Sequence, residues 1–309
     1  MQLTRGCCDM KTMLVTGGTV FISRYTAEYF AKRGWQVSVL NRGTRQQHAG
    51  VELIRADRHA LGDALRHRHF DAVLDVTAYT ADDVNALLDA LGGYGQYILI
   101  SSSAVYPETE MQPFRADAAI GPNVHWGRYG TDKIAAELAL HARDADAYIL
   151  RPPYLYGLGN NVYREAFVFD CARADRAFYL PGEGGMQLHF LHVEDLCRFT
   201  QILLEKRPEQ RIFNVGNPET VSIRDWVAVC YAVCGKEPRF VSVSHDVEQR
   251  QYFPFYNYEY VLDVSAQCSL MRDFIPMEKG LEEAFAWYCT HGDEVRRKPL
   301  LEYIDRYLS

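Results

Sequence analysis

Tyr129 and Lys133 stand four residues apart in the segment Tyr129-Gly130-Thr131-Asp132-Lys133. If this segment opens a helix, the spacing places a phenol and an ammonium on one face, one turn apart, where both can reach the same bound molecule. A nearby positive charge favours the phenolate and moves the tyrosine toward proton transfer near neutral pH. The same spacing is also typical of a solvated helix surface, so the role of this pair depends on where the rest of the chain places it.

The first half of the chain alternates short apolar runs with helical segments. Repeated β-α-β units predict a parallel sheet with helices on both faces. Ligands of such sheets bind beyond the carboxyl ends of the strands. The predicted strands are 13–16, 36–40, 51–54, 72–76 and 97–101, the helices are 23–33 and 81–91, and the segments at the ligand edge are Gly17-Gly18-Thr19, Asn41-Arg42, Asp57-Arg58, Thr77-Ala78-Tyr79 and Ser101-Ser102-Ser103.

Six segments resemble, in sequence and in order, the extended short-chain dehydrogenase/reductase family, within its NAD-dependent epimerase/dehydratase branch and a TGGTxFxG-type subgroup. The resemblance implies a Rossmann-type, doubly wound α/β sheet with a smaller, mostly C-terminal substrate lobe. It assigns 11–157 with 189–216 to the dinucleotide-binding core and 158–188 with 217–309 to the substrate lobe, after a loose tail at 1–10. The matching segments are TGGTVFIS at 16–23, ISSSAVY at 100–106, YGTDK at 129–133, RPPYLYG at 151–157, HVEDL at 192–196 and FNVGN at 213–217.

The same resemblance implies three catalytic residues. In the family, a serine or threonine four residues before the tyrosine of the V-Y pair bonds the reacting oxygen, and counting back from Tyr106 gives Ser102. The tyrosine of YxxxK is the acid/base and the lysine holds the nicotinamide ribose, which here are Tyr129 and Lys133. The implied reaction is hydride transfer between a nicotinamide ring and a substrate carbon.

The implied cofactor residues surround the glycine turn, which lies between a strand and a helix as a diphosphate-binding turn requires. Where the family usually has its later glycines, this chain has Val20 and Ser23, and Val20 brings a branched side chain toward the diphosphate. The cofactor set is Gly17, Gly18, Thr19, Val20, Phe21, Ile22, Asn41, Arg42, Arg45, Asp57, Arg58, Thr77, Ala78, Lys133 and Pro152.

Cofactor choice depends on the end of the second strand. Asn41 stands where an acidic residue normally accepts hydrogen bonds from the ribose of NAD, and Arg42 and Arg45 can pair with a 2′-phosphate. NADP is therefore favoured, and NAD stays open. Asp57 and Arg58 resemble the family's adenine-side residues, and the alternative for them is a simple ion pair in a turn.

The substrate lobe is less regular in sequence. The family commonly places an arginine for a substrate diphosphate where this chain has Leu188. The aromatic-rich stretch 251–260 either lines a sugar-binding cleft or covers a hydrophobic seam, and the seam is favoured. The candidate substrate contacts are Tyr79, Ser103, Tyr154, Asn160, Asn161 and Gln187.

Composition limits the remaining alternatives. The 309 residues carry a net charge of −7, with 48% hydrophobic and 24% charged residues, which is ordinary for a globular protein and gives no broad footprint for nucleic acid. No apolar run reaches the roughly 20 residues of a membrane span, and residues 1–10 lack a secretion signal. The eight scattered cysteines form no C-x-x-C pair, so no metal site is predicted. We expect a cytoplasmic protein with a small-molecule partner, no membrane contact and a homodimer as an open question.

The leading interpretation is an NAD(P)-dependent epimerase or reductase acting on a sugar or nucleotide sugar. A dehydratase is ranked lower because Ser103 and Ala104, which follow Ser102, provide no acid/base pair for a neighbouring carbon. The alternative is a non-catalytic Rossmann-fold regulator or RNA-binding protein, since relatives with the TGGTxFxG turn include chloroplast stem-loop-binding proteins.

Overall fold

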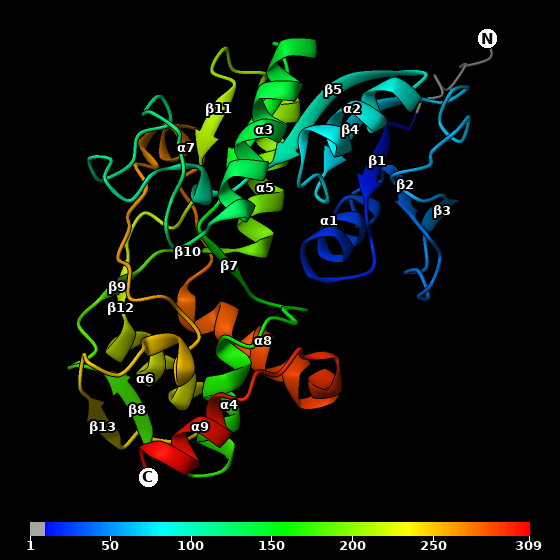
Figure 1. Cartoon of the computed structure of the whole chain (residues 1–309). Coiled ribbons are helices and arrows are strands. Elements are labelled where there is room, and N and C mark those ends of the chain that lie inside the picture. Colours follow the sequence, from blue (N-terminus) through cyan, green and yellow to red (C-terminus); the bar gives the residue numbers. More distant parts are fainter. Residues whose placement is uncertain (1–9) are drawn as a thin grey trace.

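Seven parallel strands form the central sheet (Figure 1). The computed structural model describes residues 10–309, so the tail expected at 1–10 lies, apart from residue 10, outside the described residues. In the strand order β11-β6-β5-β4-β1-β2-β3, β1 lies between β4 and β2. The switch point of this doubly wound sheet lies between β1 and β4, where the direction of the strand order reverses. The predicted Rossmann-type fold is confirmed. The strands are β1 (Thr12–Thr16), β2 (Gln36–Asn41), β3 (Val51–Arg55), β4 (His69–Asp75), β5 (Gly93–Ile100), β6 (Tyr148–Arg151) and β11 (Ile212–Asn214).

Helices cover both faces of this sheet. One face carries α1 and α5, and the other carries α2 and α3. Side chains of β1 alternate between the two faces, so Met13 and Val15 join the first apolar cluster and Leu14 joins the second. The strands read as continuous apolar runs because both faces are buried. The helices are α1 (Phe21–Lys32), α2 (Ala81–Ala90), α3 (Arg128–Arg143) and α5 (Val193–Lys206).

The lower lobe of Figure 1 has a separate core that is rich in aromatic side chains. Helices α4, α6 and α8 pack together, and the strands form the pairs β7–β10, β8–β13 and β9–β12. Tyr106 and Phe114, from the loop after β5, also pack in this core. They belong to the range 11–157 that was assigned to the dinucleotide-binding core, so the proposed domain boundaries stay a prediction. The elements are β7 (Tyr154–Tyr156), α4 (Glu165–Arg173), β8 (Phe178–Pro181), β9 (Gln187–Leu188), β10 (Phe190–His192), β12 (Val221–Ser222), α6 (Ile223–Val233), β13 (Phe240–Val243), α7 (Ser265–Leu270), α8 (Met277–His291) and α9 (Leu300–Tyr307), with short 3₁₀ turns η1 (Ser103–Val105), η2 (Gln249–Gln251) and η3 (Gly292–Glu294).

Within residues 10–309, no helix is both long enough and apolar enough to cross a membrane.

Candidate active site

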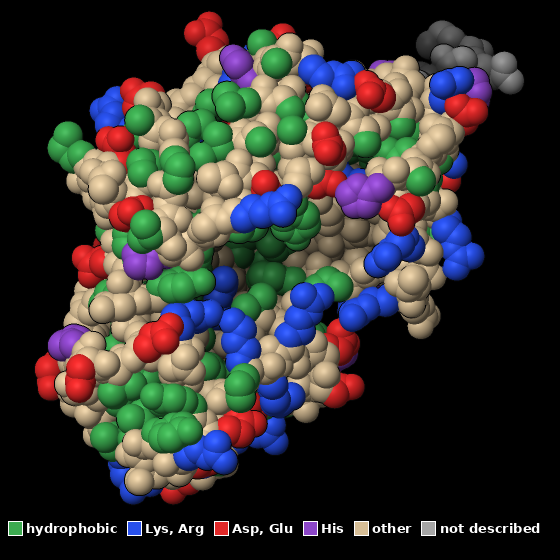
Figure 2. Space-filling view, in the orientation of Figure 1, with side chains coloured by type: hydrophobic (Ala, Val, Ile, Leu, Met, Phe, Trp, Pro, Cys, Tyr) green, Lys and Arg blue, Asp and Glu red, His purple; other side chains and the backbone are tan. Residues whose placement is uncertain are grey.

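A pocket of about 360 Å³ opens where the carboxyl ends of β5 and β6 face the lower lobe. Figure 2 shows the hollow between the two lobes, with apolar side chains inside it and lysine and arginine side chains along its edges. The pocket brings together nine residues that the sequence predicted for catalysis, cofactor or substrate. These are Phe21, Ile22, Tyr79, Ser102, Ser103, Tyr129, Lys133, Pro152 and Tyr154.

Helix α3 places Tyr129 in this pocket. The helix begins at Arg128, and its first turn lies directly against the η1 turn, since a Cβ built on Gly130 would stand 2.5 Å from the carbonyl oxygen of Ala104. A side chain at this position would push α3 away from the strand end that carries Ser102. Gly130 therefore sets how closely Tyr129 approaches the serine segment.

The pKa of Tyr129 lies above its ordinary value. Burial around the hydroxyl is the main cause, and the neighbouring Ser102 hydroxyl works in the opposite direction. The residue as a whole is 42% exposed, and it lines the pocket. Burial outweighs Ser102 and Arg164, which both lower the pKa of Tyr129, and the influence of Lys133 on the phenolate stays a prediction.

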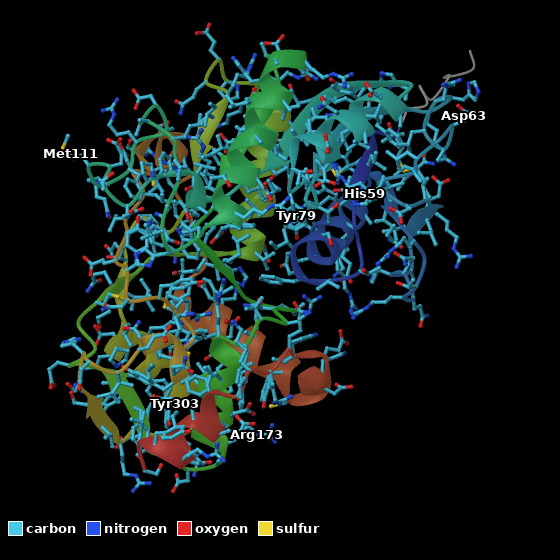
Figure 3. The ribbon with its side chains drawn as sticks, viewed as in Figure 1. His59, Asp63, Tyr79, Met111, Arg173 and Tyr303 are labelled. Atoms are coloured by element: carbon cyan, nitrogen blue, oxygen red, sulfur yellow. The ribbon has the colours of Figure 1, made fainter. Side chains whose placement is uncertain are left out.

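Lys133 is buried beneath the pocket. Its Nζ donates to the carbonyl oxygens of Ala78, at 2.7 Å, and Ile100, at 2.9 Å, and it lies 5.0 Å from the ring centroid of Tyr79. Burial lowers its pKa to about 8. Because an ammonium has three N–H donors, one remains to bind a ligand in the pocket. Figure 3 places Tyr79 beside α3, on the side of the sheet that faces the lower lobe.

The three consecutive serines have different partners. Ser101 donates to Glu137, which is held in a buried ion pair with Arg151 at 2.6 Å. Ser103 is buried, and its backbone N–H donates to the oxygen of Pro152 at 2.9 Å. The Oγ of Ser102 accepts a hydrogen bond from the N–H of Ala104 at 3.2 Å and lines the pocket. Of the three, Ser102 is best placed to hydrogen-bond a substrate oxygen.

The glycine turn fits a dinucleotide diphosphate. Gly17 and Gly18 have φ values of 94° and 92°, and a Cβ on Gly18 would lie 2.5 Å from Cγ1 of Val39. No side chain among residues 10–309 caps the N-terminus of α1, so its first N–H groups can bind a phosphate. Val20 has an extended backbone, with φ of −138°, that does not require glycine, and Ser23 Oγ donates to its oxygen at 3.0 Å. The turn is thus compatible with these two departures.

Asp57 and Arg58, which were expected on the adenine side of the cofactor, have hydrogen-bond partners within the protein. Arg58 forms an ion pair with Asp75 at 2.6 Å and donates to Thr77 Oγ1 at 2.9 Å, so its guanidinium is committed inside the fold. Burial acts to raise the pKa of Asp75, but Arg58 outweighs it and the pKa is lowered. Asp57 is exposed and accepts from the N–H of His59, as a turn residue does. Neither residue lines the catalytic pocket.

The residues at and after the end of β2 include one amide, Asn41, and two guanidinium groups, Arg42 and Arg45. The Asn41 amide donates to the oxygen of Gly17 at 2.6 Å, which ties the second strand to the glycine turn. Arg42 and Arg45 are exposed, and Arg45 lines a separate pocket that includes Thr19. Two guanidinium groups are therefore available near the position of an adenosine ribose.

Three predicted substrate contacts lie away from the pocket. Asn160 is buried and donates to Glu165 at 2.9 Å. Asn161 lines a smaller cavity between α1 and α8, and Gln187 accepts from Thr220 at 3.1 Å within the β9–β12 pair. Leu188 is only 2% exposed and belongs to the apolar core of the lower lobe.

The pocket residues that were not predicted as site residues include His125, Trp126, Arg164, Tyr256 and Tyr260. The first two precede Tyr129 in the loop before α3, and their short spacing from it was an available signal. The stretch 251–260 both packs in the apolar core and lines the pocket. Phe253 and Phe255 are in the core, whereas Tyr256 and Tyr260 line the pocket. Arg164 precedes α4, where the sequence gives no comparable signal.

Comparison with known proteins agrees with this geometry. The chain is 28% identical over 269 residues to the chloroplast stem-loop binding protein of 41 kDa b from Arabidopsis thaliana, covering 79% of this chain and 70% of that protein. It is 26% identical to a dTDP-4-dehydro-6-deoxy-D-allose reductase from Streptomyces sp., covering 91% and 97%. The fold matches dTDP-glucose 4,6-dehydratase from Bacillus anthracis, solved with NAD, at a TM-score of 0.74 and 16% identity, covering 94% of this chain and 99% of that one. Residues 13–216 match the NAD dependent epimerase/dehydratase family, and the chain belongs to that family of NAD(P)-dependent enzymes.

Proposed function

We propose that this chain is an NAD(P)-dependent reductase or epimerase of a sugar or nucleotide sugar, with Tyr129 as the acid/base. The observation that carries the proposal is the convergence of Ser102, Tyr129 and Lys133 on one pocket that also receives Phe21 and Ile22 from the start of α1. A nicotinamide cofactor supplies or accepts the hydride when bound. The chain itself orients the substrate oxygen and moves the proton.

Tyr129 can serve the reductive direction as a proton donor. A phenol keeps its proton at neutral pH, and burial raises the pKa of Tyr129 further, so the group is present in its protonated form and can donate to a carbonyl oxygen as the neighbouring carbon receives hydride. Ser102 then holds the same oxygen from the strand end. The full-length similarity to a reductase supports the same direction.

The residues that would hold the cofactor are the glycine turn, the N-terminus of α1 and Lys133. Gly17 and Gly18 allow the backbone to approach the diphosphate, and the remaining N–H donor of Lys133 suits a ribose hydroxyl. Arg42 and Arg45 favour NADP, since a guanidinium pairs well with a 2′-phosphate.

Turnover and cofactor binding test the proposal together. NADPH or NADH is mixed with the protein and a 4-keto nucleotide sugar, the loss of reduced cofactor is followed by absorbance, and the product is identified by mass spectrometry. For the epimerase arm, the unoxidised nucleotide sugar is incubated with NAD⁺ or NADP⁺ and the isomer is sought by NMR. We expect turnover in one arm and a thermal shift with NADP(H) larger than with NAD(H). A protein that shows no thermal shift with either cofactor at millimolar concentration would contradict the proposal.

The second candidate is a non-catalytic RNA-binding protein, supported by the similarity to a chloroplast stem-loop binding protein. The net charge of −7 argues against a broad RNA surface. Stem-loop RNA that binds at physiological salt, without cofactor binding or turnover, would favour this candidate.

A further inference from the structure

A fully buried carboxylate lies at the ligand edge of the central sheet. Asp75 ends β4 and is 0% exposed. Its Oδ1 accepts from Thr16 Oγ1 at 2.7 Å and from Arg58 at 2.7 Å. Its Oδ2 accepts from Arg58 at 2.6 Å and from the Tyr97 hydroxyl at 2.5 Å. One side chain therefore joins the end of β1, the turn after β3 and the middle of β5.

Stability alone does not account for this arrangement. Taking a carboxylate and a guanidinium out of water costs free energy, and buried ion pairs can often be replaced by apolar residues with no loss of stability. The pair of Asp75 and Arg58 lies where ligands of parallel sheets bind, at the carboxyl ends of the strands. Its place therefore favours a role in the cofactor site.

The Thr16 side chain links Asp75 to the backbone that follows β4. Its Oγ1 donates to Asp75 and accepts from the N–H groups of the next two residues, at 2.9 and 3.1 Å. Gly17 follows Thr16, and a Cβ built on Gly17 would stand 3.1 Å from Cγ2 of Thr77. The start of the glycine turn and the segment after β4 are thus in direct contact.

Arg58 holds the same segment from its other side. The guanidinium donates to Thr77 Oγ1 at 2.9 Å and forms ion pairs with Asp75, at 2.6 Å, and with Asp83, at 3.3 Å. Asp83 also accepts from the N–H groups of residues 79 and 80, at 2.8 and 3.0 Å. The segment between β4 and α2 is therefore fixed at both ends by carboxylates that share one guanidinium.

This segment lies between the two groups that would hold the cofactor. On one side Thr77 packs against the glycine turn, and on the other the oxygen of Ala78 accepts from Lys133 Nζ at 2.7 Å. A shift of the segment would change the distance between the turn that receives the diphosphate and the lysine that receives the ribose.

The charge of Asp75 also acts on Lys133. Burial lowers the pKa of Lys133 to about 8, and Asp75 is the carboxylate that most opposes this change. The other charged groups that face Lys133 are Glu137, Asp83 and Arg58. Without the Asp75 carboxylate, the pKa of Lys133 would therefore fall further.

We propose that Asp75 is a positioning residue of the cofactor site, which keeps the segment between β4 and α2 at a fixed distance from the glycine turn and from Lys133. The inference rests on the proposed function for the two groups that hold the cofactor. Because Asp75 is fully buried, it acts through Thr16, Arg58 and the segment that they hold.

The amino end of the same strand pair provides a matched control. Asp71 in β4 accepts from the backbone N–H and the hydroxyl of Thr12 in β1, at 2.7 and 3.0 Å. This is again a threonine of β1 bonded to an aspartate of β4. Asp71 is exposed, however, and lies away from the ligand edge, so Asp71→Asn changes the same kind of contact outside the cofactor site.

Cofactor binding by the wild type, Asp75→Asn and Asp71→Asn tests the proposal. Dissociation constants of NADPH and NADH are measured by nucleotide fluorescence, and thermal unfolding without cofactor shows that each variant is folded. We expect Asp75→Asn to bind the preferred cofactor about tenfold more weakly or worse, because the neutral amide no longer pairs with Arg58. Asp71→Asn should bind it as the wild type does. Equal affinity in Asp75→Asn and the wild type would overturn the proposal, as would an equal loss in Asp71→Asn.

Two readouts distinguish positioning from a general loss of stability. Without cofactor, backbone amides of residues 76–80 should exchange hydrogen faster in Asp75→Asn, while amides of β1 and β5 exchange as in the wild type. The upper pH limit of NADPH binding should also move to lower pH, because Lys133 loses the carboxylate that favours its charged form. Faster exchange throughout the sheet, with an unchanged pH limit, would assign Asp75 to stability alone.

Thr16→Val replaces Asp75→Asn if the latter does not fold. It removes the hydroxyl between Asp75 and the segment without changing any charge, and Thr12→Val is its control at the amino end of β1. Thr16→Val should weaken cofactor binding and speed exchange in residues 76–80. Wild-type affinity and exchange in Thr16→Val would contradict the proposal.

Three outcomes separate this inference from the proposed function. If a cofactor binds and Asp75→Asn weakens it, but no sugar substrate is turned over, the proposed function fails and the positioning role stands. If a sugar is turned over with the same cofactor KM in the wild type and Asp75→Asn, the proposed function stands and the positioning role fails. If the wild type binds neither cofactor, both fail.

Discussion

The two walls of the catalytic pocket are built in different ways. The sheet wall carries Ser102, Tyr129 and Lys133, which come from one strand end and the next helix, and its single cation is held by two backbone carbonyls. The lower-lobe wall carries Arg164 and, beside it, Arg250 and Lys298, which come from three distant segments and have no carboxylate partner within residues 10–309.

Under the proposed function, this difference would separate reaction from recognition. Groups that move a proton work best when they are fixed and desolvated, and on the sheet wall Lys133 is buried and burial raises the pKa of Tyr129. Groups that recognise an anion need donors still available to it, and Arg164 has only one weak bond, to the oxygen of Leu155 at 3.5 Å, whereas Arg250 also donates to the oxygens of Phe253 and Pro254. Changes to the sheet wall should therefore reduce kcat, and changes to the lower-lobe wall should raise KM.

The largest effect is expected for Tyr129→Phe. Removing the phenolic proton donor should lower kcat by about 10²- to 10⁴-fold, the usual contribution of a general acid. Binding of NADPH, measured by its fluorescence, and of UDP should stay near the wild-type values, because the aromatic ring remains. Turnover equal to that of the wild type would remove Tyr129 from the mechanism and break the proposed division between the walls.

The next effect is a pH-dependent change in stability for Lys133→Met. The pKa of Lys133 is lowered from 10.5 to about 8, so between these values the unfolded chain binds more protons than the folded chain. Unfolding free energy of the wild type relative to the variant should therefore rise as pH increases through this window, by on the order of 2–3 kcal/mol in all. Urea unfolding at a series of pH values measures it.

Lys11→Met is the control for this experiment, because Lys11 is exposed, directly before β1. Its stability should change with pH in parallel with the wild type. If Lys133→Met also runs parallel to the wild type, the ammonium is not held in the buried environment described for it.

The same contrast explains what the sequence could predict. The residues of the sheet wall follow local sequence patterns. Apolar runs that end in polar residues predicted the strands, and a spacing of four on a helix predicted that Tyr129 and Lys133 lie together. Asp75 also gave a signal, since a carboxylate at the end of an apolar run needs a partner, but its pairing with Arg58 across the sheet was not identified.

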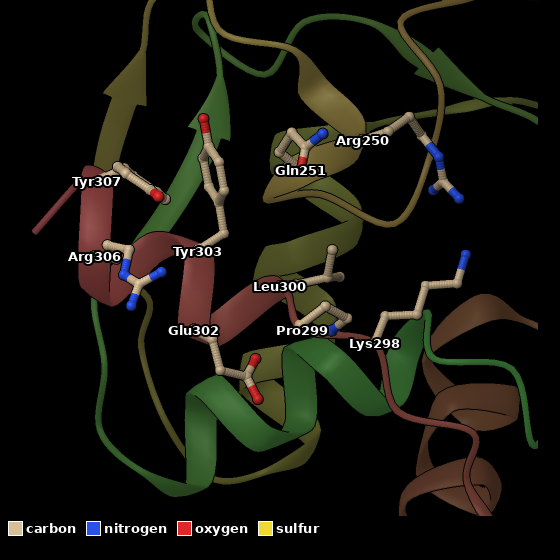
Figure 4. Close-up of a pocket in the computed structure, with 9 residues that line it drawn as sticks. All are labelled: Arg250, Gln251, Lys298, Pro299, Leu300, Glu302, Tyr303, Arg306 and Tyr307. Atoms are coloured by element: carbon tan, nitrogen blue, oxygen red, sulfur yellow. The ribbon is translucent and has the colours of Figure 1, made fainter.

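The lower-lobe wall could not be predicted in this way. Arg164 reaches this pocket from the segment before α4, and Arg250 reaches the pocket next to α9 from η2 (Figure 4), and both guanidinium groups stack on aromatic rings of Tyr154, Phe255 or Tyr256. Conversely, Asn160 was expected at the substrate because it lies in a loop-rich segment, and in the structure it donates to Glu165 inside the protein. Loop position alone does not tell whether a polar side chain faces a ligand or completes the fold.

Gly130→Ala tests how the sheet wall is positioned. The new Cβ would meet the Ala104 oxygen at 2.5 Å, so α3 must shift away from the η1 turn. We expect a loss of about 1–3 kcal/mol in unfolding free energy from overpacking, and a fall in kcat of up to about 10²-fold from misplacement of Tyr129. Leu138→Ala, on the exposed side of α3, is the control and should leave kcat unchanged. Wild-type kcat in Gly130→Ala would show that the close approach at Gly130 does not set the catalytic geometry.

The smallest effect is expected for Arg164→Gln in steady-state kinetics. Arg164 touches the pocket from the lower lobe, and as a binding group it should contribute equally to the ground state and the transition state. KM for a nucleotide-linked substrate should therefore rise about tenfold while kcat stays near the wild-type value. Added salt should weaken wild-type binding and have less effect on the variant. A fall in kcat at unchanged KM would mean instead that the guanidinium acts on the reacting atoms, and the lower-lobe wall would then share in catalysis with Tyr129.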